Sequence, residues 1–151
     1  MHVIAAKAIA FREAQQPEFV AYARNVVDNA KTLAGELKDL GFRIVTGGTD
    51  THLLLIDLRS TDMTGKEAED LLDSVNISTN RNGIPFDTRS PALTSGLRLG
   101  TPAVTTRGMG PEEMKQIARL IHNVLSQPKD EKVKQDVLEA VAGMVSRFPT
   151  G

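Results

Sequence analysis

The spacing of hydrophobic residues predicts a long amphipathic helix between Glu18 and Leu40. Apolar side chains recur there every three or four positions, and Gly41 stands where a C-cap is expected. Residues 2 to 11 differ, because apolar side chains surround most of the helix that they predict. We expect that first helix to be buried on nearly all sides. Its start without an N-cap suggests that the chain was once longer and that the helix packed against something upstream.

The segment FRIVTGGTDTHLLLIDLRS, residues 42 to 60, predicts two strands joined by a Gly-Gly turn. Residues 53 to 58 are almost continuously apolar, which is typical of a strand in the middle of a sheet. We expect the two strands to form an antiparallel pair.

Further helices follow from local signals. Thr64 and Glu67 have the spacing of a capping box, and Pro111 stands at the expected first position of another helix. Apolar residues between 133 and 145 predict a final amphipathic helix. Asn80 to Gly96 contains two prolines and no helical period, so we expect a long loop that its embedded apolar residues keep ordered.

Composition limits the function classes. The chain has 151 residues, of which 40% are hydrophobic and 25% charged, and these values fit one compact domain. A net charge of -1 argues against a nucleic-acid or anionic membrane partner. Cysteine is absent and the three histidines are far apart, so we expect no disulfide and no metal. No run of about 18 apolar residues occurs, and we expect a soluble protein.

Arg98 is the most informative charged residue. It stands between Leu97 and Leu99, and between Gly96 and Gly100, in the stretch TSGLRLGTPAVTTRGMG. A permanently charged guanidinium in so apolar a run is costly unless a carboxylate or phosphate meets it. That anion is either a ligand or an internal Asp or Glu, and the pattern alone leaves both readings open.

Five segments, in this order, resemble the C-terminal part of serine hydroxymethyltransferase: HVIAAKAIAF, GGTDTHLLLIDL, TGKEAEDLLD, TNRNGIPFDTRSP and TSGLRLGTPAVTTRGMG. The resemblance extends from His2 to Phe148 and is most specific in the last two segments. It departs from the usual family residues at four positions without removing a charge or a key amide: Thr51, Arg81, Thr88 and Met109.

The resemblance implies an α+β fold of the α/β class, namely the small C-terminal domain of the aspartate aminotransferase fold type. That domain is a mainly antiparallel sheet covered by helices. Residues 1–16 would form a helix at the junction with a missing large domain, and residues 17–151 would form the small domain. The family is cytoplasmic, and a homodimer or higher homo-oligomer is implied.

The resemblance also implies an activity. The family is pyridoxal-phosphate dependent and converts serine and tetrahydrofolate to glycine and 5,10-methylenetetrahydrofolate, the cofactor acting as an electron sink. Arg98 would hold the substrate carboxylate, for which a planar fork of donors is suited. Asn82, with the backbone of Gly83 and Ile84, would contact the folate. An Asn-Gly pair is also a common turn, so a purely structural role for Asn82 stays open.

The lysine that binds the cofactor in this family belongs to a segment that does not occur here. Pyridoxal phosphate would therefore be bound by the missing large domain, and we expect the isolated chain to be inactive. Two alternatives remain: a stand-alone small-ligand or partner-binding module, or a structural role in which Arg98 is paired internally. We expect His52 to be structural and Arg107 to form a salt bridge or cap a helix.

Overall fold

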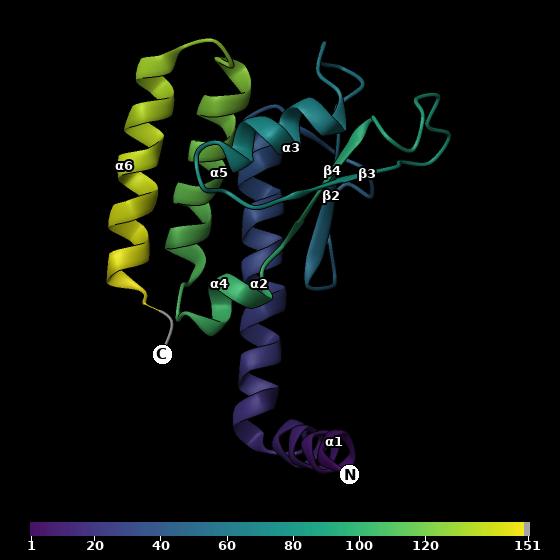
Figure 1. Ribbon diagram of the computed structural model, residues 1–151, viewed down its shortest axis with the longest axis vertical. Coiled ribbons are helices and arrows are strands. Elements are labelled where there is room, and N and C mark those ends of the chain that lie inside the picture. The colour runs from purple at the N-terminus through teal and green to yellow at the C-terminus, as the bar shows by residue number, and fades with distance from the viewer. Residues whose placement is uncertain (150–151) are drawn as a thin grey trace.

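The computed structural model describes residues 1–149, so the last two residues of the expected small domain, 150 and 151, lie outside it. Six helices and four strands follow one another along the chain (Figure 1): α1 (His2–Ala14), α2 (Pro17–Asp39), β1 (Arg43–Ile44), β2 (Leu53–Asp57), α3 (Gly65–Asp73), β3 (Asn80–Asn82), β4 (Gly96–Gly100), α4 (Pro102–Thr106), α5 (Pro111–Ser126) and α6 (Glu131–Arg147).

The four strands form one antiparallel sheet in the order β1-β2-β4-β3. This arrangement confirms the α+β class, the antiparallel pairing of residues 42 to 60 and the central position of the apolar strand. Helices α2 and α3 pack against the sheet, α5 packs on these two helices, and α6 packs on α5 (Figure 1). The helices thus cover one face of the sheet and leave the other face open.

The core lies between the covered face of the sheet and the helices. Most of its largest fully buried side chains come from α2, β2, α3, β4, α5 and α6, among them Leu37, Leu54, Ile56, Leu72, Leu97, Met114, Ile121 and Val137. Within the sheet, Leu54 lies opposite Leu99 and Ile56 lies opposite Leu97. Because side chains alternate along a strand, these two pairs place the apolar residues of β2 and β4 on the same, covered face.

Local signals predicted several helix ends correctly. Gly41 has a φ of 96°, and the N–H of Phe42 donates to the carbonyl of Leu37, which is the Schellman arrangement at the end of α2. The hydroxyl of Thr64 and the carboxylate of Glu67 form a reciprocal capping box at the start of α3. Pro111 begins α5 as expected.

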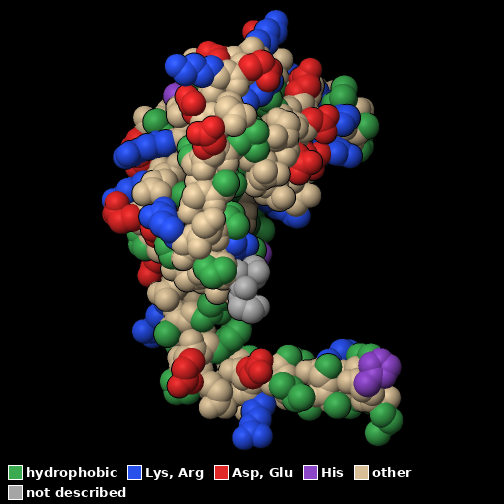
Figure 2. Space-filling model, turned by 60° about the vertical axis from the view of Figure 1, so that its left-hand side comes forward, with side chains coloured by type: hydrophobic (Ala, Val, Ile, Leu, Met, Phe, Trp, Pro, Cys, Tyr) green, Lys and Arg blue, Asp and Glu red, His purple; other side chains and the backbone are tan. Residues whose placement is uncertain are grey.

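The expected burial of the first helix is wrong for the described chain. Every side chain of α1 is exposed, including Phe11 at 68% and Ile4 at 66%. The helix projects as an arm with hydrophobic side chains along it (Figure 2), and its main contact is with α2. A sequence this apolar requires a partner for burial, and residues 1–149 do not provide one.

The segment after residue 80 also differs from the expected loop. Asn80–Asn82 forms the edge strand β3, which pairs with β4. The three polar residues of β3 show no alternation of apolar and polar positions, so the sequence does not predict a strand there. The strand forms because the edge of β4 offers backbone groups for pairing. Pro102–Thr106 forms the short helix α4, which is too brief to show a helical period in the sequence.

Gly96 and Gly100 provide a matched test of this packing. A Cβ on Gly96 would lie 2.5 Å from Ile84 Cγ2 and 2.6 Å from the carbonyl oxygen of Asn82, whereas on Gly100 the nearest atom would be 3.7 Å away. Gly96→Ala should therefore lower the free energy of unfolding by about 1–3 kcal/mol, the range found for overpacking. Gly100→Ala should be nearly neutral. Chemical denaturation of both variants checks this, and equal effects would contradict it.

Candidate functional site

Arg98 lies on the open face of the sheet. Leu97 and Leu99 are buried on the covered face, and the alternation of β4 turns the Arg98 side chain to the opposite side, where it is exposed. The expected cost of burying the guanidinium therefore does not arise. Arg98 is charged and accessible, with Leu55 of β2 and Asn80 of β3 as its neighbours across the sheet.

The guanidinium of Arg98 borders a cavity of about 420 Å³. Residues from β2, β3, β4 and α4 line it, together with three that precede β2 or β3: His52, Leu53, Ser78, Thr79, Asn80, Arg98, Gly100, Pro102 and Ala103. Nη2 of Arg98 donates to Oδ1 of Asn80 at 3.4 Å. Among residues 1–149, no carboxylate lies within 4.0 Å of this guanidinium. An internal ion pair is thus absent from the described chain, and four N–H groups remain for an external anion.

Asn82 is the last residue of β3 and shares the open face with Arg98. It lies opposite Gly96, two residues along β4 from Arg98, and such diagonal neighbours are about 7–8 Å apart. Its Nδ2 donates to the carbonyl of Gly83 at 2.7 Å, so the amide stabilises the local turn. Its Oδ1 has no partner among residues 1–149 and can accept a hydrogen bond from a ligand.

Gly83 and Ile84 differ in their availability. Gly83 is exposed, whereas Ile84 is buried and its side chain lies beside Gly96. The N–H of Ile84 donates to Asp87 Oδ2 at 3.3 Å and its carbonyl accepts from the Asp87 N–H. The expected backbone contact at Ile84 therefore competes with Asp87.

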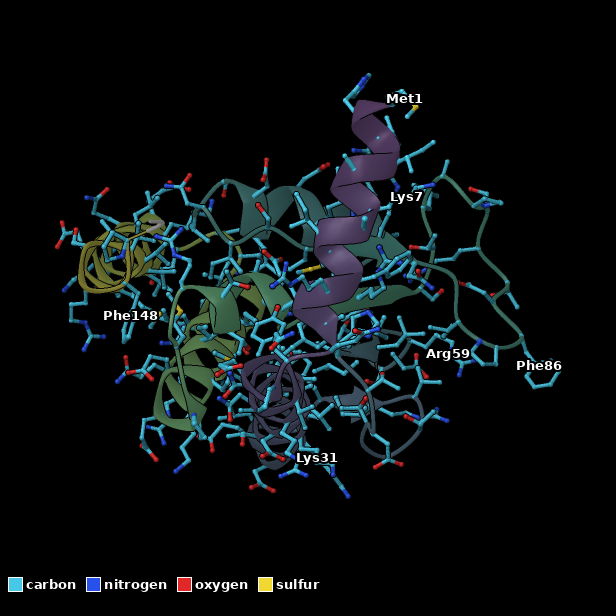
Figure 3. All side chains as sticks on the ribbon, turned by 90° about the horizontal axis from the view of Figure 1, so that it is seen from below. Met1, Lys7, Lys31, Arg59, Phe86 and Phe148 are labelled. Atoms are coloured by element: carbon cyan, nitrogen blue, oxygen red, sulfur yellow. The ribbon has the colours of Figure 1, made fainter. Side chains whose placement is uncertain are left out.

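Sequence reasoning missed Asp87, which organises the loop between β3 and β4. Its carboxylate accepts from the N–H of Arg89 at 3.0 Å, the N–H of Ser95 at 2.8 Å and the hydroxyl of Ser95 at 2.7 Å. These hydrogen bonds, led by the Ser95 hydroxyl, lower the pKa of Asp87 to about 2. An Asp that bonds the N–H two residues ahead is an Asx turn, a signal that was readable in the sequence. Figure 3 shows Phe86 at the tip of the same loop, pointing away from the helices.

A second missed group also faces the open side. The carboxylate of Asp57 is only 2% exposed and contacts Arg59 Nη2 at 2.8 Å and Arg43 Nη1 at 3.2 Å. The hydrogen bond from Arg59 is the main reason that the pKa of Asp57 is lowered. Two guanidinium groups therefore meet the carboxylate of Asp57, whereas no carboxylate among residues 1–149 lies within 4.0 Å of the Arg98 guanidinium.

Two residues judged structural from the sequence do make structural contacts. The carbonyl of His52 accepts from the N–H of Thr101 at 3.0 Å, immediately after β4. Arg107 Nε donates to the carbonyl of Phe148 at 2.8 Å, and Nη2 donates to that of Val145 at 3.4 Å. Arg107 therefore caps the C-terminal end of α6, and its predicted capping role is confirmed.

Within residues 1–149, none of the helices has the length and apolar character needed to cross a bilayer. Nor does any cluster of three or more histidines and carboxylates there have the arrangement of a metal site.

Comparison with known proteins gives a consistent result. The family model described as serine hydroxymethyltransferase matches residues 1–121. Serine hydroxymethyltransferase from Crocosphaera subtropica is 54% identical over 147 residues, which are 97% of this chain and 34% of that protein. The proteins of the same name from Rippkaea orientalis and Nostoc sp. are each 53% identical over 148 residues, 98% of this chain and 35% of theirs.

The geometry around Asp87 predicts a pH dependence. The pKa of this carboxyl falls from 3.8 to about 2 on folding. The carboxylate therefore stabilises the fold at pH values above 3.8, and this contribution disappears as the pH falls through about 2. In an NMR titration, the Ser95 amide shift should follow a pKa near 2, and a value near 3.8 would contradict the assignment. Asp87→Asn should destabilise the protein at pH 7 more than Asp50→Asn, whose side chain is 98% exposed.

Proposed function

The chain belongs to the serine hydroxymethyltransferase family, and from this membership we propose that it supplies the amino-acid carboxylate site and a folate contact of that enzyme. The chain spans about a third of the length of the curated relatives that it matches (34–35%). In this proposal residues 1–16 form the junction with a large domain and residues 17–151 form the small domain. The assembled enzyme is a cytoplasmic homo-oligomer that converts serine and tetrahydrofolate to glycine and 5,10-methylenetetrahydrofolate.

Arg98 carries the proposal. It is an exposed guanidinium with no carboxylate within ion-pair distance in residues 1–149, and it borders a cavity on the open face of the sheet. The planar fork binds both oxygens of an amino-acid carboxylate and so fixes the orientation of the substrate as well as its charge. Asn80, which accepts from Nη2, holds the guanidinium over the cavity.

Asn82 is the folate contact in this proposal. Its free Oδ1 accepts from a pteridine N–H, while Nδ2 keeps the amide plane fixed through Gly83. Asp87 and Ser95 order the loop that follows, so the amide is presented on a rigid segment. Arg98 and Asn82 share one sheet face, and this arrangement suits an amino acid and a folate bound side by side.

The residues of this chain do not fit a pyridoxal-phosphate site. None of the eight lysines lines the cavity at Arg98, and none is buried. Three of them form ion pairs on the surfaces of their own helices: Lys66, Lys115 and Lys134. In the proposal the cofactor is therefore held by the large domain, and this chain binds and orients substrates only.

A chimera tests the proposal. Residues 1–151 replace the corresponding third of the Crocosphaera subtropica relative, which is 54% identical. We expect the chimera to cleave serine. Arg98→Ala should weaken glycine and serine binding, because the substrate carboxylate is then buried without its partner. The expected loss is about 2–5 kcal/mol of binding free energy, or roughly thirtyfold to several-thousandfold in affinity. Arg98→Lys should keep the fold and the charge but lose the two-pronged hydrogen bond.

The matched control is Asn82→Ala in the same chimera. It should weaken folate binding and leave glycine binding unchanged, while both variants retain cofactor absorbance and wild-type thermal stability. Binding is measured by calorimetry with glycine and with a folate. Loss of folding in Arg98→Ala, or equal weakening of cofactor and amino acid, would show that Arg98 is a structural residue.

The isolated chain should have no serine-cleaving activity, because it offers pyridoxal phosphate no buried lysine. After incubation with the cofactor and reduction by borohydride, mass spectrometry should find no lysine that carries one cofactor molecule per chain. A single stoichiometrically modified lysine would overturn this expectation. Glycine binding by the isolated chain as tight as in the chimera would favour the stand-alone binding module.

A further inference from the structure

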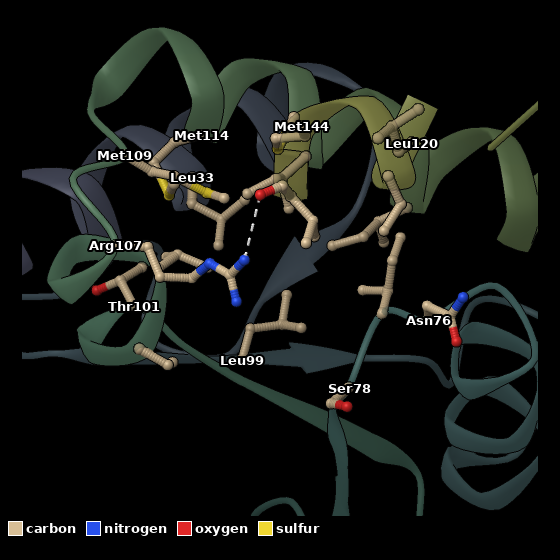
Figure 4. A pocket seen from close by; sticks show the side chains of 18 residues that line it. Leu33, Asn76, Ser78, Leu99, Thr101, Arg107, Met109, Met114, Leu120 and Met144 are labelled. Carbon is tan, nitrogen blue, oxygen red and sulfur yellow. Dashed lines mark hydrogen bonds between the residues drawn. The ribbon is translucent and has the colours of Figure 1, made fainter. Parts of the chain in front are cut away.

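A second cavity lies on the other side of β4 from Arg98. It has a volume of about 330 Å³ and is lined mainly by residues of β4, α4, α5 and α6, together with Leu33 of α2 and residues 76–78 (Figure 4). Leu99 faces this cavity, whereas its neighbour Arg98 faces the open side of the sheet. Ser78, Gly100 and Ala103 border both cavities, but Arg98 lines only the first and Arg107 only the second.

The lining of this cavity is mostly apolar and adaptable. Three methionines contribute, Met109, Met114 and Met144, alongside aliphatic side chains such as Ile117 and Val141. An apolar cavity of about 150 Å³ already holds benzene, and ligand pockets start at about 300 Å³. Methionine is unbranched and polarizable, so it adjusts to ligands of different shape. The cavity is large enough for an apolar molecule bigger than benzene.

Arg107 gives the cavity a charge. Its half-buried guanidinium extends among the lining residues (Figure 4) and uses two of its five N–H groups on the carbonyls of Phe148 and Val145. In the part of the chain that the structure describes, no carboxylate lies within 4.0 Å of it. A cation with three free donors beside an apolar cavity favours an anion that carries an apolar body.

We propose that this cavity binds a small amphipathic monocarboxylate, such as a medium-chain fatty acid. The carboxylate accepts hydrogen bonds from Arg107, and the apolar chain lies between the three methionines and the aliphatic residues of α5 and α6. The proposal does not depend on the activity proposed above, since none of these contacts involves Arg98 or Asn82.

The test uses the whole 151-residue chain with sodium octanoate and 1-octanol as probes, and with methionine methyl groups labelled for NMR. Octanoate should shift the methyl signals of Met109, Met114 and Met144 and leave those of Met1 and Met63, which do not line the cavity. Calorimetry should show octanoate binding at least tenfold tighter than octanol. Signals that do not move at millimolar octanoate, or equal affinities for the two probes, would overturn the proposal.

Variants separate the contribution of the apolar chain of octanoate to binding from that of its carboxylate. Val141→Phe, which fills the cavity, should abolish binding of both probes. Arg107→Gln should weaken octanoate about tenfold or more and leave octanol unchanged. Arg147→Gln is the matched control, because Arg147 lies on α6 but outside the cavity lining, and it should change neither affinity. If Arg107→Gln does not fold, the comparison of the two probes and Val141→Phe still decide the outcome.

Discussion

The antiparallel pairing of β2 with β4 is the contact on which both the core and the candidate site depend. The two strands are separated by about 40 residues of sequence, yet their register places Leu54 opposite Leu99 and Ile56 opposite Leu97. A slip of one residue would turn the leucines of β4 to the open side and Arg98 into the core. The same pairing thus stabilises the core and keeps one guanidinium accessible.

Both ends of β4 are fixed by hydrogen bonds to distant segments. Before the strand, Ser95 is held by the carboxylate of Asp87. After it, the fully buried Thr101 donates through its hydroxyl to the carbonyl of Val26 in α2, at 2.8 Å. The strand that carries Arg98 is therefore constrained along its length, which limits the entropy that a bound ligand must remove.

Much of the fold could be predicted from the sequence, because the decisive signals are local. The period of α2, the Thr64 capping box and the continuous apolar run of β2 each depend on residues close together in the chain. The predictions that failed concern which surfaces of the chain are buried by other parts of the protein. The burial of α1 and the environment of Arg98 depend on partners that no local pattern encodes.

The candidate site was predicted unevenly for the same reason. Arg98 was singled out by its apolar neighbours and Asn82 by a family motif, and only the sheet register shows that they share a face. The carboxylates of Asp57 and Asp87 were missed, since their importance rests on arginines and a serine brought to them by folding or by a turn. Such contacts determine the local charge and the rigidity of the site, but they produce no periodic pattern of hydrophobic residues that a sequence reading could detect.

The edges of the sheet have a further consequence for how copies of this chain can meet. β1 has two residues and β3 has three, and charged or polar side chains occupy most of these positions. Edge strands this short and polar are poor templates for strand addition. Most of the exposed large hydrophobic residues instead lie on α1 and the start of α2, and the others are scattered, as Phe86, Leu93 and Val145 are. These surfaces favour contact between copies through helices, with crossing angles set by the ridges of their side chains, over growth of a continuous sheet.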